Sequence, residues 1–95
     1  MKYVSNTFSP KMLSGKGAKM VSFKQISKET FEEKTKDAYS IIGHKKIAQL
    51  LGKPFNRETI TLKKGDELYL ALSNKHRLGE NHGLQDSTYF MRCKV

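Results

Sequence analysis

The chain has 95 residues, and its 18 lysines and arginines against 9 aspartates and glutamates give a formal net charge of +9. This charge favours a polyanionic partner, although a lysine-rich surface that serves solubility has the same composition. Cys93 is the single cysteine, which excludes an internal disulfide, a CxxC redox pair and a cysteine-built zinc cluster. No run of about 18 apolar residues and no signal-peptide pattern occurs, so we expect a soluble, cytoplasmic protein.

The N-terminal quarter of the chain predicts two strands. Residues 3–7 have strand character and lead through a Ser-Pro turn into a predicted helical turn at 11–13. Residues 18–25 alternate between apolar and polar side chains, with Val21 and Phe23 on the same side. This alternation is typical of a strand with one buried face.

Two helices are predicted next. Ser27 is a favourable N-cap with acidic residues close behind it, and it predicts a polar surface helix over 27–38. After a short apolar stretch, residues 44–51 predict a second helix, and Gly52 supplies its C-terminal stop. Three apolar side chains of this second helix can share a buried stripe, namely Ile47, Leu50 and Leu51.

The remaining chain predicts three strands. Residues 59–63 and 67–73 form two alternating runs, and the Lys-Gly-Asp sequence between them, with Gly65 at its centre, predicts a hairpin. Residues 89–95 alternate as a closing strand would. Three leucines of the central run are expected to face the core, namely Leu68, Leu70 and Leu72.

These elements predict one small domain over residues 1–95 of the α+β (mixed α/β) class, with a mixed sheet of about five strands and flanking helices. A chain of this length buries a modest fraction of the surface that it exposes when unfolded. Association with a second copy would bury more, and we therefore expect a homodimer.

His44 is the most prominent candidate for chemistry, because it follows Gly43 at the start of the second predicted helix. Backbone N–H groups at a helix start can bind an anion, and an imidazole exchanges protons near neutral pH. A phosphate held there would meet a proton donor or acceptor. Lys45 and Lys46 strengthen the phosphate interpretation, while an exposed histidine beside solvated lysines is the plain alternative.

The polar segment 74–86 is a second candidate site, because it carries Lys75, Arg77 and Glu80 around two glycines. Arg77 can bind a phosphate through two hydrogen bonds, and Glu80 can accept a proton or orient a hydroxyl. An ordinary charged surface loop explains the same residues equally well. Whether Lys75 or Arg57 reaches a ligand is left open by the sequence.

Neutral hydrogen-bonding groups follow the first predicted strand. Asn6 and Ser9 can contact a base or a phosphate, and they can equally close the turn before Pro10. The three histidines do not have the spacing of metal ligands, and we expect no metal and no cofactor. The chain contains no P-loop, GxGxxG fingerprint, nucleophile elbow or kinase motif, which argues against ATP-driven chemistry.

Three segments in order resemble a known family: SNTFSPKML at 5–13, IIGHKKIAQLLG at 41–52 and TLKKGDELYLALSNKHRLGE at 61–80. Together they are similar to the viral anti-CRISPR ring nucleases, small proteins of archaeal viruses and phages that degrade cyclic tetra-adenylate, the messenger of type III CRISPR systems. The most specific element is the isoleucine-glycine-histidine run followed by alanine-glutamine-leucine-leucine. The resemblance spans most of the chain.

The resemblance implies roles for individual residues. His44 falls on the catalytic histidine of the family, Arg77 on its phosphate-binding arginine and Glu80 on its active-site glutamate. Asn6 and Ser9 match a ligand-contacting asparagine and serine.

Two departures from the family bear on the ligand. Lys46 lies just after the histidine, where the family has small hydroxyl residues. Ser73 replaces a longer glutamine. The preferred ring size and the base contacts therefore stay open.

The implied reaction needs no metal. Each ribose 2′-OH of a 3′–5′ linked ring can attack its own phosphate in line, which gives a 2′,3′-cyclic phosphate and a 5′-OH. His44 would protonate the departing 5′-oxygen, while Arg77 and the backbone at Gly43 stabilise the charge on phosphorus. A four-membered ring contains a two-fold axis, which suits a homodimer with the ligand at its interface.

Two other functions remain. The same pocket can hold a cyclic oligonucleotide without cutting it, as a sponge. A basic viral regulator that binds duplex DNA or RNA is the other alternative, and it predicts binding that weakens steeply with salt. The chain shows neither helix-turn-helix spacing nor an aromatic-rich stripe, so long nucleic acid is the less favoured partner.

Overall fold

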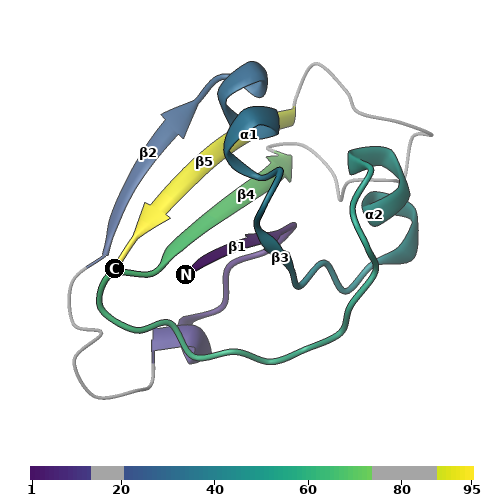
Figure 1. Cartoon of the computed structure of the whole chain (residues 1–95). Coiled ribbons are helices and arrows are strands. Elements are labelled where there is room, and N and C mark those ends of the chain that lie inside the picture. Colours follow the sequence, from purple (N-terminus) through teal and green to yellow (C-terminus); the bar gives the residue numbers. More distant parts are fainter. Residues whose placement is uncertain (14–20, 74–87) are drawn as a thin grey trace.

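The computed structural model describes residues 1–13, 21–73 and 88–95. In this part of the chain five strands form one sheet in the order β2-β5-β4-β1-β3. The strands are β1 (Lys2–Ser5), β2 (Ser22–Ile26), β3 (Tyr39–Ser40), β4 (Glu67–Ser73) and β5 (Thr88–Lys94). The helices are η1 (Pro10–Leu13, a 3₁₀-helix), α1 (Lys28–Lys34) and α2 (Lys45–Leu51). The predicted α+β class with a five-stranded sheet is confirmed (Figure 1).

The sheet is mixed, as predicted. Strand β1 pairs in parallel with both β3 and β4, while β5 pairs antiparallel with β4 and β2. In the β1–β4 pair Tyr3 lies opposite Leu68, and in the β4–β5 pair Leu68 lies opposite Cys93. Strands β1, β3 and β4 therefore all end at the same edge of the sheet.

Strand β4 is buried on both faces, so the core has two halves. Helices α1 and α2 supply Phe31, Ile47 and Ala48 to one half, which includes Tyr69 and Ala71 of β4. On the opposite face Leu68 and Leu70 pack with further apolar residues, namely Ile41, Leu62 and Cys93. Leu72 is half-buried and packs against this second half. The alternation identified the leucine face of β4 but not the burial of its other face.

Both predicted helices form where their caps indicate. The Ser27 hydroxyl oxygen accepts a hydrogen bond from the Thr30 N–H at 3.1 Å. Helix α1 ends at Lys34 rather than at residue 38, because Thr35 forms its C-cap and donates its hydroxyl to the Phe31 carbonyl at 2.7 Å. Gly52 ends α2 in the left-handed conformation, with φ of 66°.

The predicted hairpin between residues 59–63 and 67–73 is wrong. Residues 59–63 form no strand, and β4 pairs with β1 and β5 instead. The first run is held by other partners: the Leu62 N–H donates to the Met12 carbonyl, and the Lys63 N–H donates to the Asp66 carboxylate. The sheet has five strands because it includes β3, which the sequence pattern did not identify.

The predicted buried face of the second strand is also wrong in part. Val21 packs against the core, but Phe23 is 48% exposed. Because β2 is an edge strand that pairs with β5 alone, little of the fold covers this side chain; the Phe8 ring contacts it edge to face. Among the described helices, none has the length and apolar character that a membrane crossing requires.

Candidate functional site

The topology brings two of the predicted site segments together. Strand β1 ends at Ser5, directly before Asn6, and β3 ends at Ser40, four residues before His44. The two strands are parallel neighbours, and the Ile41 N–H donates to the Val4 carbonyl at 2.9 Å beyond the last paired residues. Ligands of open sheets with parallel strands commonly bind beyond the carboxyl ends of those strands. We therefore expect a binding site beyond the carboxyl ends of β1 and β3.

The loop after β1 is shaped by serine hydroxyls. The Ser5 oxygen accepts the Thr7 N–H, and the Ser9 oxygen accepts the Lys11 N–H, each at 3.3 Å. The Ser9 carbonyl accepts the Met12 N–H at 2.9 Å and so opens η1. The turn-closing interpretation of Ser9 is confirmed, and its hydroxyl hydrogen can still donate to a ligand.

His44 is the N-cap of α2. Its backbone is extended, with φ of −133° and ψ of 114°, and its Nδ1 accepts the Ile47 N–H at 3.4 Å. Only a nitrogen without a proton accepts such a bond. The hydrogen-bond partner therefore assigns the proton of the neutral ring to Nε2, which is a donor for a ligand. The imidazole is exposed.

The chain after α2 returns to His44 and brings Arg57 with it. An isolated parallel bridge joins Ile42 to Phe55, and the Asn56 N–H donates to the Ile42 carbonyl at 2.9 Å. Arg57 then donates its Nε–H to the Gly43 carbonyl at 3.3 Å. This contact holds the root of the guanidinium group beside His44.

One open pocket of about 450 Å³ collects these groups. Its polar lining comes from the loop after β1, from the segment before α2 and from the segment that begins at Arg57. The lining residues are Ser5, Asn6, Thr7, Ser9, Lys11, Met12, Ile41, Gly43, His44, Arg57, Glu58, Thr59 and Ile60. A hollow of about 470 Å³ shares Gly43, His44 and Arg57 with it and adds Lys45, Lys46 and Phe55.

The chemistry of this pocket suits an anion that carries hydroxyls. Arg57 and Lys11 are cationic, Glu58 contributes a carboxylate, and Asn6 and Ser9 contribute neutral polar groups. A guanidinium binds phosphate through two parallel hydrogen bonds, and an imidazole beside it can transfer a proton.

Four of the predicted site residues line this one pocket: Asn6, Ser9, Gly43 and His44. Lys46 lies in the adjoining hollow. Ser73 is the last residue of β4, where its backbone pairs with Thr88. Arg77 and Glu80, like Lys75, lie outside the described residues, so their predicted roles stay predictions.

Sequence reasoning missed Lys11 and Glu58 and left Arg57 open. For Arg57 and Glu58 the reason is that residues 59–63 were assigned to a hairpin with 67–73, which relates the segment before them to no part of the chain near His44. The signal that was available is the cation beside a carboxylate in the Asn56-Arg57-Glu58 sequence, but nothing local relates it to the distant His44.

In the described ranges no three His, Cys, Asp or Glu side chains gather as a metal site would require. Cys93 is buried, and desolvation raises the pKa of its thiol to about 11. A thiol with so high a pKa carries little thiolate at neutral pH, so Cys93 is a core residue rather than a nucleophile.

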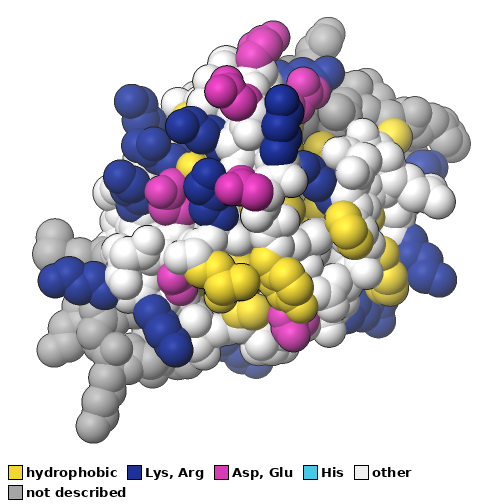
Figure 2. Space-filling view, in the orientation of Figure 1, with side chains coloured by type: hydrophobic (Ala, Val, Ile, Leu, Met, Phe, Trp, Pro, Cys, Tyr) yellow, Lys and Arg dark blue, Asp and Glu magenta, His cyan; other side chains and the backbone are white. Residues whose placement is uncertain are grey.

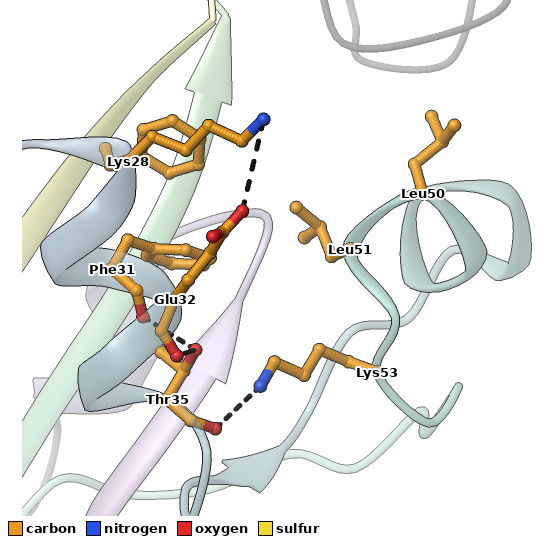
Figure 3. Close-up of a pocket in the computed structure, with 8 residues that line it drawn as sticks. Lys28, Phe31, Glu32, Thr35, Leu50, Leu51 and Lys53 are labelled. Atoms are coloured by element: carbon orange, nitrogen blue, oxygen red, sulfur yellow. Dashed lines mark hydrogen bonds and ion pairs between the residues drawn. The ribbon is translucent and has the colours of Figure 1, made fainter.

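A smaller cavity of about 240 Å³ lies between α1 and α2 (Figure 3). Its lysines already have partners: Lys53 donates to the Thr35 carbonyl at 2.7 Å, and Lys28 lies 3.9 Å from Glu32. Burial lowers the pKa of Lys53, an effect that the charge of Glu32 opposes. None of the described residues lines both this cavity and the His44 pocket, and the latter is the better candidate site.

Comparison with known proteins gives matches to a family model and to solved structures. The model of the STIV B116-like family matches residues 2–88. A solved structure, B116 of Sulfolobus turreted icosahedral virus, superposes with a TM-score of 0.81 at 20% sequence identity, covering 99% of this chain and 98% of that one. At this identity the likeness shows a shared fold. The search of curated proteins found no match.

Proposed function

The chain belongs to the STIV B116-like family, which is named after a viral protein, and from this premise and the His44 pocket we propose that it is a metal-independent ring nuclease. Its substrate in this proposal is cyclic oligoadenylate, most favourably cyclic tetra-adenylate. By removing this messenger the protein would suppress type III CRISPR signalling in the cytoplasm of the cell that makes it.

The observation that carries the proposal is the convergence of Asn6, Ser9, Gly43 and His44 on one pocket. These residues come from two segments that are more than 30 residues apart in the chain. Their residue types and the family resemblance mark them as site residues independently of where the fold places them. A proton-transfer group, a guanidinium and neutral hydrogen-bonding groups around one opening are what phosphodiester transfer needs.

In the proposed reaction a ribose 2′-oxygen attacks the adjacent phosphorus as the bond from phosphorus to the 5′-oxygen breaks. The proton of the 2′-OH leaves to a base, and His44 gives a proton to the departing 5′-oxygen. Arg57, which lines the pocket, stabilises the extra negative charge on the phosphoryl oxygens together with Arg77, to which the resemblance assigns this role. The products are a 2′,3′-cyclic phosphate and a 5′-OH.

His44 must carry two ring protons to act as this acid. The bond from the Ile47 N–H to Nδ1 belongs to the neutral ring, and its length of 3.4 Å makes it a weak one. An imidazolium has no free nitrogen to accept the Ile47 N–H, so the doubly protonated ring gives up this cap and donates from Nε2 to the substrate. After proton transfer the ring is neutral and can cap α2 again.

Two carboxylates compete for the role of base. The resemblance places Glu80, which lies outside the described residues, on an active-site glutamate of the family, while Glu58 lines the pocket. Glu80→Gln and Glu58→Gln, compared for kcat at saturating substrate, separate the two. The variant that removes the base lowers kcat about 100-fold or more.

Assay of the wild-type protein in EDTA tests the proposal. Cyclic tetra-adenylate should become linear fragments that end in 2′,3′-cyclic phosphate, while a ring methylated on every 2′-oxygen should bind and stay intact. Cleavage of the methylated ring would contradict 2′-oxygen attack. A natural ring that comigrates with the protein uncut would establish the sponge instead.

Duplex DNA or RNA is the alternative partner that the net charge of +9 raises. On the face in Figure 2 lysine and arginine side chains are interleaved with acidic ones, rather than gathered in a continuous stripe. If the protein is a ring nuclease, we expect duplex binding to be weak and to be lost when the salt concentration is raised from about 50 to 200 mM, while binding of the cyclic ring persists.

A further inference from the structure

Phe55 is an aromatic residue in an unusual position beside His44. Its side chain is 40% exposed, yet its backbone is held by the bridge to Ile42. On one side of it, the Pro54 carbonyl accepts the Ser40 hydroxyl at 2.6 Å. On the other, the Asn56 N–H donates to the Ile42 carbonyl. The fold thus fixes the position of a ring that it does not bury.

Two cations lie against this ring. The Lys45 Nζ is 5.6 Å from the ring centroid, and the Arg57 Cζ is 5.8 Å from it. Cations at these distances are attracted to the ring face. An exposed aromatic ring beside positive charges is the combination with which proteins bind the bases and phosphates of single-stranded nucleic acid.

The hollow at Phe55 adjoins the pocket. It has a volume of about 470 Å³, within the range of about 300–1,000 Å³ that is usual for small-ligand sites. Gly43, His44 and Arg57 line both openings. A nucleotide whose phosphate lies between His44 and Arg57 therefore has its base within reach of this hollow.

We propose that Phe55 is the stacking surface for an adenine base of the substrate, next to the phosphate that is cleaved. This inference rests on the proposed function and adds a base-binding residue to it. Lys45 and Arg57 lie against the ring and would hold the sugar–phosphate chain beside it. Stacking accepts any base in principle, and purines have the larger face, so the hollow favours adenylate rings over pyrimidine rings.

Phe55→Leu tests the stacking surface while keeping an apolar side chain of similar size. We expect KM for cyclic tetra-adenylate to rise about tenfold or more and kcat to stay within about twofold, since the loss of one stacked base weakens binding rather than proton transfer. Phe55→Tyr should restore KM. The matched control is Phe23→Leu, which removes the exposed ring on β2 and should change neither constant.

Phe55→Trp adds a direct reading, because the chain contains no tryptophan. Adenosine 5′-monophosphate should quench the introduced indole, and ribose 5-phosphate should not. If the wild type cuts the ring but Phe55→Leu keeps its KM and the indole is not quenched, the stacking surface is refuted and the nuclease stands. If the indole is quenched but the wild type leaves the ring intact, the stacking surface stands and the nuclease fails. A dimer that Phe55→Leu converts into monomers would assign the ring to a subunit interface and refute stacking.

Discussion

The side chain of His44 has a structural role as a helix cap and a proposed chemical role as a proton donor. As the N-cap of α2 it offers Nδ1 to the Ile47 N–H, and as the proposed acid it must offer a proton to the substrate. The first role is structural and other residue types can fill it, since asparagine, aspartate and serine are the usual N-caps. The second is chemical, and among these residues a histidine alone transfers protons near neutral pH. The two roles can therefore be separated by substitution.

His44→Asn keeps a capping acceptor, whereas His44→Ala removes it. We expect His44→Ala to lower the free energy of unfolding by about 1 kcal/mol, which is typical of a lost cap. His44→Asn should unfold within about 0.3 kcal/mol of the wild type. Urea unfolding of the three proteins measures this. Equal stability of His44→Ala and the wild type would show that the weak capping bond adds nothing.

The hydrogen bond between Tyr69 and Glu67 is expected to make the stability of the fold depend on pH. The Tyr69 hydroxyl donates to the Glu67 carboxylate at 2.6 Å. This bond lowers the pKa of Glu67, although desolvation opposes it. For Tyr69, desolvation first and then the carboxylate raise the pKa to about 12. A lowered folded-state pKa means stability that is present above the ordinary pKa of glutamate and is lost as the pH falls through the folded-state value.

Tyr69→Phe removes this bond and keeps the buried ring. At pH 7 we expect a loss of roughly 1.5 kcal/mol in unfolding free energy, at the low end for a bond to a charged group because Glu67 is partly exposed. The difference from the wild type should shrink as the pH falls below the ordinary pKa of glutamate and through the lowered folded-state value, where Glu67 becomes protonated. Thermal unfolding across this pH range gives the comparison. A difference that does not change with pH would assign the loss to packing instead.

At the scale of elements, helices and strands that depend on local sequence signals were predictable, and those that depend on long-range pairing were not. The Ser27 cap, the Gly52 stop and the alternation of β4 and β5 were predictable because each depends on residues close together in sequence. The partner of residues 59–63 was not, since that segment bonds to Met12, about 50 residues away. Strand β3 has two residues, too few for any periodicity.

The candidate site likewise has residues that could be predicted from the sequence and residues that could not. Asn6, Ser9, Gly43 and His44 were predictable from the family resemblance, which marks residues without placing them. Arg57 reaches the pocket through the bridge of Ile42 to Phe55 and its own bond to the Gly43 carbonyl. Both contacts arise from tertiary structure. No local pattern around Arg57 carries this information.

Gly52 at the end of α2 provides a test at this scale. Its φ of 66° lies in the left-handed region, and a Cβ there would meet nothing within 4 Å. Gly52→Ala should therefore cost about 1 kcal/mol from backbone conformation alone and lower Tm by about 4–8 °C. Gly43→Ala is the matched control, because the nearest atom to its Cβ is the Arg57 Cγ at 3.4 Å. A similar loss at both positions would contradict the conformational explanation.

At the scale of the whole molecule, one small sheet has apolar side chains on both faces. The sheet presents its polar loops at the edge where β1 and β3 end, and a pocket at an open edge can be completed by a second copy. We expect a two-fold symmetric dimer in which each protomer places one His44 against a ring of matching symmetry. Such a dimer can cut one ring at two positions.

Analytical ultracentrifugation with and without cyclic tetra-adenylate measures the dimer. One ring per two chains is the expected stoichiometry, and the ring should raise Tm, with a stabilisation that grows as the logarithm of its concentration over the dissociation constant. One ring per chain, or a monomer that stays active at nanomolar concentration, would contradict the shared site. The stoichiometry is measured on His44→Asn, so that the ring survives the experiment, and the activity at nanomolar concentration is measured on the wild type.

The most direct test of the central claim is a single-turnover comparison in EDTA. Wild type and His44→Asn, each in excess over cyclic tetra-adenylate, are sampled over time, and the products are separated by chromatography and weighed. Catalysis with His44 as the acid predicts linear products with 2′,3′-cyclic phosphate ends from the wild type and a rate at least about 100-fold lower from His44→Asn at equal stability and equal binding. Equal rates from the two proteins, or a ring left whole by both, would contradict it.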